Sequence, residues 1–187
     1  MTQARILGGI TMVAVFALDQ ASKFAILHGF GAPGQPPRFR TPFLDLTLSW
    51  NRGISFSLLP QDTSAGIWLL LGFTLVATAL LGVWLWFART PLVALGLGAI
   101  IGGAVGNGCD RLTYGAVVDF LDLHAFGRHF FVFNVADAAI NIGVALLIFD
   151  GLFGRSGQDR SAPPEGPLGG DSLSYPRKRA SGGSDRR

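Results

Sequence analysis

Long apolar stretches alternate with short polar segments through most of the chain. Three of them reach or approach the roughly 20 residues that a helix needs to cross a bilayer, over about 6–27, 65–88 and 91–108. A fourth, over about 134–153, reaches that length only if the ionisable side chain of Asp137 lies in the membrane zone. Such a placement is costly and points to function. The pattern predicts an all-α membrane protein with four transmembrane helices.

A different periodicity separates the first two predicted helices. Residues 44–50 and 54–58 alternate apolar and polar side chains, and Asn51-Arg52-Gly53 between them is typical of a turn. We therefore expect a β-hairpin that forms a small extracytoplasmic sheet on the membrane surface, with its apolar face against lipid, substrate or the helices. Residues 129–133 are a candidate further strand.

Small residues recur in the third predicted helix, where Gly98, Gly102 and Gly106 are spaced four residues apart. A ridge of this kind lets helix backbones approach one another closely in lipid. We interpret these glycines as packing positions.

The composition agrees with lipid as the surrounding solvent. Hydrophobic residues make up 49% of the chain and charged residues 14%, whereas soluble domains carry about 25% charged residues. The net charge of +3 arises after residue 153, so we expect a membrane domain over 1–153 and a disordered basic tail over 154–187. The tail, Arg5 and Arg89 favour cytoplasmic termini, although other arginines fall in the opposite loops.

Polar residues gather at one predicted membrane depth. If the N-terminus is cytoplasmic, three separate segments bring ionisable or amide side chains to the outer end of the helices. These residues are Asp19 and Lys23 near the outer end of the first helix, Asn107, Asp110 and Arg111 at the outer end of the third, Asp119 in the loop that follows, and Asn134 and Asp137 at the outer end of the fourth.

Asp119 and Asp137 are the natural pair within this group, because both lie among apolar neighbours. Two carboxylates close together in a low-dielectric site cannot both ionise easily, so they share a proton. Such a pair hydrolyses peptides without a covalent intermediate, one member acting as base and the other as acid. The alternative is two unrelated charges, with Asp119 solvated in a loop and Asn134 or Asp137 capping a helix.

Other interpretations of the polar residues remain open. Asp19 and Lys23, one helical turn apart, either orient the first helix against the site or form a structural ion pair. Asn51 is either a ligand of substrate or a turn residue. Cys109 as a nucleophile would define a cysteine hydrolase, but no activating arrangement is visible. The histidines lack metal-ligand spacing, and we expect neither a metal nor another cofactor.

Four motifs occur in a characteristic order. They are Asp19-Gln20-Ala21-Ser22-Lys23, then Asn51-Arg52-Gly53-Ile54-Ser55-Phe56, then Gly106-Asn107-Gly108-Cys109-Asp110-Arg111 leading to Gly115-Ala116-Val117-Val118-Asp119-Phe120, and last Phe133-Asn134-Val135-Ala136-Asp137-Ala138-Ala139-Ile140. With these motifs the chain resembles the lipoprotein signal peptidase (signal peptidase II) family over nearly all of residues 5–153. The resemblance implies four membrane spans, a small surface β-sheet and a catalytic pair at Asp119 and Asp137.

The resemblance also implies supporting or substrate-binding residues and a substrate. The supporting set is Asp19, Lys23, Asn51, Arg52, Gly53, Asn107, Asp110, Arg111 and Asn134. The implied substrate is a bacterial prolipoprotein with a diacylglyceryl-modified cysteine, cut just before that cysteine to release the signal peptide. We expect a monomer in the bacterial inner membrane, in contact with phospholipids and not with nucleic acid.

A transporter is the alternative from another class. In a small ion- or proton-coupled membrane transporter, the intramembrane Asp and Lys side chains would form a relay. The absence of inverted repeats and broken helices from the sequence pattern argues against this reading.

Overall fold

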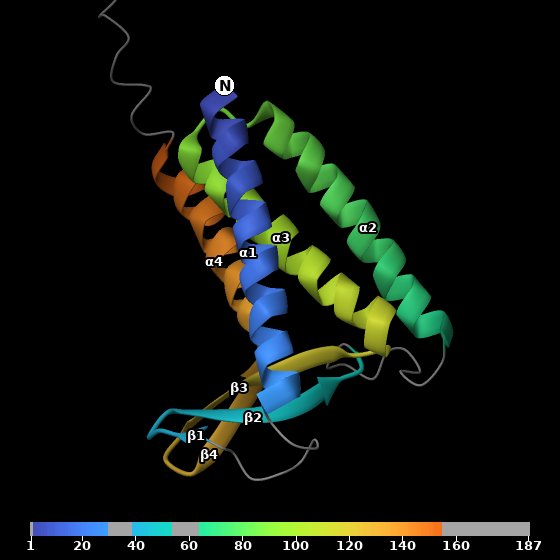
Figure 1. Ribbon diagram of the computed structural model, residues 1–187. Helices are drawn as coiled ribbons and strands as arrows, with labels where there is room; N and C mark the ends of the chain where they lie inside the picture. The colour runs from blue at the N-terminus through green and yellow to red at the C-terminus, as the bar shows by residue number, and fades with distance from the viewer. Residues whose placement is uncertain (1, 30–38, 54–63, 155–187) are drawn as a thin grey trace, which may run out of the picture.

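The computed structural model describes residues 2–29, 39–53 and 64–154 (Figure 1). Its long helices are α1 (Thr2–Gly29), α2 (Ser64–Phe87), α3 (Pro91–Tyr114) and α4 (Val135–Phe149), and the π-helical turn η1 (Asp150–Gly154) extends α4. In this part of the chain, four helices have the length and apolar composition to cross a membrane. The predicted four transmembrane helices are therefore confirmed.

Helix α3 is longer than the apolar stretch that predicted it, because it continues past Gly108 to Tyr114. It begins at Pro91, after Thr90, whose hydroxyl oxygen accepts a hydrogen bond from a backbone N–H of the first turn. It ends at Gly115, which adopts the left-handed conformation (φ 71°) and donates its N–H to the carbonyl of Arg111. The polar end of α3 is thus helical rather than a loop.

Glycines bring α3 into close contact with the helices on either side of it. A Cβ atom at Gly98 would strike the carbonyl oxygen of Gly8 on α1, and one at Gly102 would lie 2.5 Å from that of Met12. On another face of α3, a Cβ atom at Gly103 would lie 2.6 Å from a carbonyl oxygen of α4. The predicted packing role of Gly98 and Gly102 is confirmed, and α3 lies buried between α1 and α4 (Figure 1).

The outward surfaces of the helices are apolar. On α2, large side chains such as Phe73 and Leu75 are 73% and 71% exposed. Exposure of this extent suits hydrocarbon rather than water, which is consistent with helices surrounded by lipid.

Four strands form one antiparallel sheet at the end of the bundle opposite the N-terminus (Figure 1). In spatial order they are β1 (Phe39–Arg40), β2 (Leu44–Asn51), β3 (Val117–Ala125) and β4 (Arg128–Phe133). The predicted small sheet is confirmed, and its candidate strand at 129–133 is β4. Residues 54–58, expected to pair with 44–50, lie outside the described residues, and β2 pairs with β1 and β3.

Asp119 lies in strand β3, so its placement in a loop was wrong. The strand begins with the β-branched residues Val117 and Val118, which are fully buried, and Asp119 stands opposite Ser49 of β2. The pairing joins segments distant in sequence, so local periodicity does not reveal it.

An apolar cluster attaches the sheet to the helices. Ile26 near the end of α1 packs against Leu48 of β2 and against Val118 and Phe120 of β3, and all four side chains are buried. This contact supplies the apolar support that a small sheet needs for stability, and it fixes β3 relative to α1.

We expect Gly102→Ala to destabilise the protein by about 1–3 kcal/mol, because its methyl group would force α1 and α3 apart. The matched control is Gly9→Ala on α1, where an added Cβ meets nothing within 4 Å. That substitution should be neutral or stabilise the helix by about 0.5–1 kcal/mol. Thermal unfolding in detergent measures both effects, and equal melting temperatures for the two variants would contradict the close contact.

Candidate active site

The two predicted catalytic aspartates come from the sheet and from the helix bundle. Asp119 lies on β3 and is only 3% exposed, whereas Asp137 lies half-buried in the first turn of α4. The start of a helix stabilises negative charge through its unpaired N–H groups. The fold therefore presents one deeply buried carboxyl group and one more accessible carboxyl group at the sheet end of the bundle.

Asn134 connects these two carboxyl groups. This fully buried residue is the N-cap of α4, and its side-chain amide donates to Asp119 Oδ1 over 2.7 Å. Its backbone N–H donates to Asp137 Oδ2 over 3.3 Å, and its Oδ1 accepts from the backbone N–H of Asp137 over 2.9 Å. Asn134 is thus a helix cap, as one alternative proposed, and also a bridge within the site.

Two further asparagines donate to the outer oxygens of the pair. Asn51 Nδ2 donates to Asp119 Oδ2 over 3.0 Å, and Asn107 Nδ2 donates to Asp137 Oδ1 over 2.8 Å. Asn51 Oδ1 also accepts from the N–H of Gly53 over 3.1 Å, so Asn51 shapes the turn as well as contacting the site. Each carboxylate oxygen therefore receives at least one hydrogen bond from an asparagine.

The electrostatic environment favours a proton on Asp119. Burial raises the pKa of its carboxyl group from 3.8 to about 6. The hydrogen bonds from Asn51 and Asn134 act in the opposite direction, because they stabilise the ionised form, while the neighbouring charge of Asp137 adds to the rise. The carboxyl group thus exchanges its proton much closer to neutrality than an ordinary aspartate.

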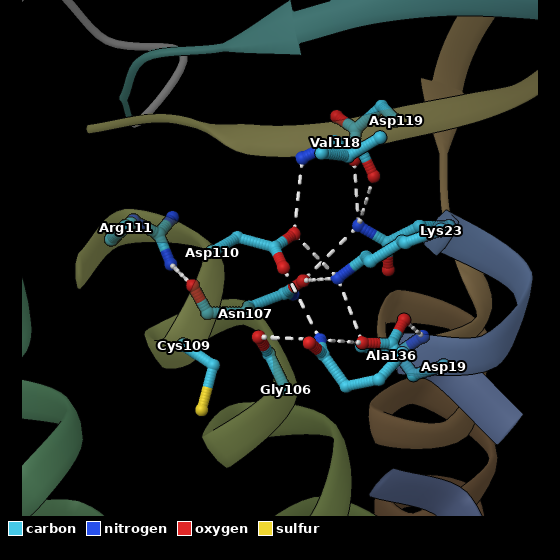
Figure 2. Close-up of polar contacts among 12 residues, drawn as sticks. Asp19, Lys23, Gly106, Asn107, Cys109, Asp110, Arg111, Val118, Asp119 and Ala136 are labelled. Carbon is cyan, nitrogen blue, oxygen red and sulfur yellow. Dashed lines mark hydrogen bonds and ion pairs between the residues drawn. The ribbon is translucent and has the colours of Figure 1, made fainter. Parts of the chain in front are cut away.

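A buried ionic network of Asp19, Lys23 and Asp110 lies near Asp119 (Figure 2). Lys23 Nζ is 2.8 Å from a carboxylate oxygen of Asp19 and 2.8 Å from one of Asp110. Gln20 completes this network, since its amide donates to Asp110 Oδ1 over 3.2 Å and to the carbonyl of Gly106 over 3.3 Å. Gln20 was not among the predicted site residues, although a polar side chain inside an apolar span is a signal of function.

Of the two predicted arginines, Arg111 interacts with the pair, and Arg52 follows Asn51 in sequence. Arg111 Nη1 donates to the carbonyl oxygen of Asn107 over 3.3 Å and interacts electrostatically with both aspartates. Arg52 directly follows the last residue of β2 and is exposed. It borders a cavity of about 260 Å³, whose lining also includes Trp50, Tyr114 and Ala116.

Cys109 lies on α3, whereas the two histidines, His124 and His129, lie in the sheet with their ring centroids 5.4 Å apart. The sulfur of Cys109 points away from the polar cluster (Figure 2). His124 lies 3.0 Å from Asp45, and His129 lies 2.7 Å from Asp122, both within the sheet. Over residues 2–29, 39–53 and 64–154, no group of three or more His, Cys, Asp or Glu side chains is arranged to hold a metal ion.

Comparison with known proteins yields both sequence and structural relatives. The chain is 45% identical over 161 residues to the lipoprotein signal peptidase of Methylobacterium sp. strain 4-46, covering 86% of this chain and 98% of that protein. It is 47% identical over 146 residues to the one from Beijerinckia indica, covering 78% and 87%. A bacterial membrane enzyme solved by the in meso method at 2.3 Å resolution is similar, with a TM-score of 0.69, 26% identity and coverage of 83% and 93%.

The fold and the site define a multi-span membrane protein with a carboxyl-based site at one end of its helix bundle. The profile of the family Signal peptidase (SPase) II matches residues 11–153. The chain belongs to the signal peptidase II family, and the resemblance inferred from its motifs is confirmed. It is therefore a membrane peptidase, and the transporter alternative was wrong.

We expect Asn51→Ala to shift the alkaline limb of the pH–rate profile of peptide cleavage to higher pH, because that limb reports loss of the proton carried by the more basic carboxyl group. Its hydrogen bond stabilises ionised Asp119, so its loss should raise the pKa of that carboxyl group further above 3.8. The melting temperature in detergent should change little, because Asn51 lies at the end of β2.

Ser49→Ala, on the same strand, is the matched control and should retain the wild-type profile. An unchanged alkaline limb in Asn51→Ala, or a loss of stability large enough to explain its defect, would count against a direct role for Asn51.

Proposed function

We propose that this chain is an intramembrane aspartic endopeptidase that removes the signal peptide from diacylglyceryl-modified prolipoproteins, cutting just before the lipidated cysteine. The observation that carries the proposal is the joining of Asp119 and Asp137 through the buried Asn134. Family membership supplies the peptidase activity, and this bridge supplies a pair of carboxyl groups able to perform it.

The proposed reaction uses one ionised and one protonated carboxyl group. The ionised group takes a proton from water as the water oxygen bonds to the scissile carbonyl carbon, and the protonated group donates its proton to the carbonyl oxygen. The C–N bond then breaks as the amine nitrogen receives a proton from the first group, while the second group takes a proton from one hydroxyl of the tetrahedral intermediate as the C=O bond re-forms, which restores the starting pair. Asp119 is the more buried of the two, which favours it as the proton carrier in the resting enzyme.

The surroundings of the pair support a lipid-modified substrate. The name lipoprotein signal peptidase, carried by the relatives, indicates a prolipoprotein as substrate for this chain also. A second cavity, of about 230 Å³, combines a cationic side chain with mainly apolar ones that suit a lipid chain. Its lining includes Ile67, Trp68, Leu71, Arg111, Leu112 and Gly115.

We further propose a monomer in the bacterial inner membrane, with both termini cytoplasmic and the site near the outer face. The sheet and the pair lie at the end of the bundle opposite the N-terminus (Figure 1). Arg5 lies near that terminus and Arg89 in the α2–α3 connection, and the positive-inside rule favours the cytoplasm for both. A diacylated cysteine held at the outer leaflet would then reach the site laterally, among phospholipids.

Asp119→Asn and Asp137→Asn should each abolish cleavage of a diacylated prolipoprotein by the purified protein, while insertion into the membrane is retained. Amide replacement preserves shape but removes the proton-transfer function. Asp122→Asn is the matched control, because Asp122 is a buried carboxylate on the same strand that contacts His129 rather than the pair. Near-wild-type turnover by either Asp119→Asn or Asp137→Asn would refute the assignment of these two residues as the catalytic pair.

Reporter fusions should locate residues 90 and 187 in the cytoplasm and residues 40 and 125 outside it. The expectation follows from four membrane helices and the arginine distribution. Paired alkaline phosphatase and fluorescent protein fusions at each position give opposite signals on the two sides. An extracytoplasmic signal at residue 90 or 187 would overturn the orientation.

A further inference from the structure

The residue before each proposed catalytic aspartate is held by a carboxylate from another element. The backbone N–H of Val118, next to Asp119, donates to Asp110 Oδ2 of α3 over 3.1 Å. The backbone N–H of Ala136, next to Asp137, donates to Asp19 Oδ1 of α1 over 2.9 Å. Two structural carboxylates thus fix the backbone at equivalent positions on either side of the site.

Lys23 joins these two structural carboxylates (Figure 2). Its Nζ lies 2.8 Å from Asp19 Oδ2 and 2.8 Å from Asp110 Oδ2, and it donates to Asn107 Oδ1 over 2.9 Å. Lys23 thus makes two hydrogen bonds, to Asp19 and Asn107, and an ion pair with Asp110. Asn107 in turn donates to Asp137, which links Lys23 to the pair by a further route.

The complete burial of these charged side chains indicates a role beyond stabilising the fold. The side chains of Lys23, Asp19 and Asp110 are 3%, 0% and 2% exposed. Removing such charges from water is costly, and well-packed apolar residues of similar volume often stabilise a protein equally well or better. The ionic group also orients its members. Each carboxylate contacts Lys23 and also accepts a hydrogen bond from one particular backbone N–H.

We propose that Lys23 is a positioning residue that, with Asp19 and Asp110, clamps the backbone beside each catalytic aspartate and so sets the separation of the two carboxyl groups. This inference rests on the proposed function. The rival explanation is purely structural: Lys23 neutralises two buried carboxylates, and any neutral packing would replace it.

The triple variant Asp19→Asn, Lys23→Met, Asp110→Asn separates the two explanations. It removes all three charges at nearly constant volume, so no buried charge is left uncompensated. We expect insertion and a melting temperature near wild type, but a fall in kcat of roughly 100-fold, as misplacement by about 1 Å produces. KM should change little, since the clamp lies behind the pair.

The pH–rate profile provides a readout that a structural role would not move. The charged groups interacting with Asp119 or its partner are Asp137, Lys23 and Arg111. In the triple variant the two carboxylates should repel each other less, so the alkaline limb, which reports the second ionisation of the pair, should move to lower pH. Asp45→Asn, which removes one partner of the sheet's Asp45–His124 contact, is the control and should leave kcat and the limb unchanged.

Wild-type kcat and an unchanged alkaline limb in the triple variant would overturn the proposal. If that variant does not insert, Lys23→Arg repeats the test with the charge retained. Its wider guanidinium should lower kcat with little change in melting temperature, whereas wild-type kcat would again overturn the proposal. If Asp119→Asn and Asp137→Asn are inactive but the triple variant is fully active, the positioning role of Lys23 is refuted and the proposed function is not. If the wild-type enzyme leaves diacylated prolipoprotein uncut, the proposed function itself is refuted.

Discussion

The hydrogen bonds of the buried Asn134 fix the position of the sheet relative to helix α4. Its side chain reaches Asp119 on the sheet while its backbone starts α4, so one residue ties the strand to the helix. Polar groups buried away from water are stable only when they are hydrogen-bonded. The demand for partners at Asp119 and Asp137 therefore explains why asparagines from β2, α3 and the start of α4 meet there.

Close packing of the helices makes this meeting possible. Glycines of α3 allow the backbones of α1 and α4 to approach it, and Gly106 leaves space for the Asp19 side chain, which a Cβ atom there would strike. The same approach brings Lys23 of α1 within reach of Asp110 of α3. Small residues and buried charges are thus two parts of one arrangement, because short ionic contacts across the bundle require short distances between backbones.

Much of this arrangement was predictable from the sequence, for identifiable physical reasons. Apolar stretches long enough to cross a bilayer exposed the four helices, and aspartates in apolar surroundings singled out Asp119 and Asp137. The pairing of β2 with β3 was not predictable, since partners far apart in sequence leave no local periodicity. The backbone N–H groups of Val118 and Ala136 were equally hidden, because every residue except proline carries the same group.

The division of the site between strand and helix has a consequence for assembly. Four helices can enter the membrane one after another, but Asp119 reaches Asn134 only when the sheet packs onto the end of α1 through Ile26, Leu48 and Phe120. In the proposed enzyme, cleavage is therefore the last property to appear during biogenesis. A partly assembled chain, in which Asp119 has not yet met Asn134, therefore lacks the joined pair of carboxyl groups that the proposed reaction requires.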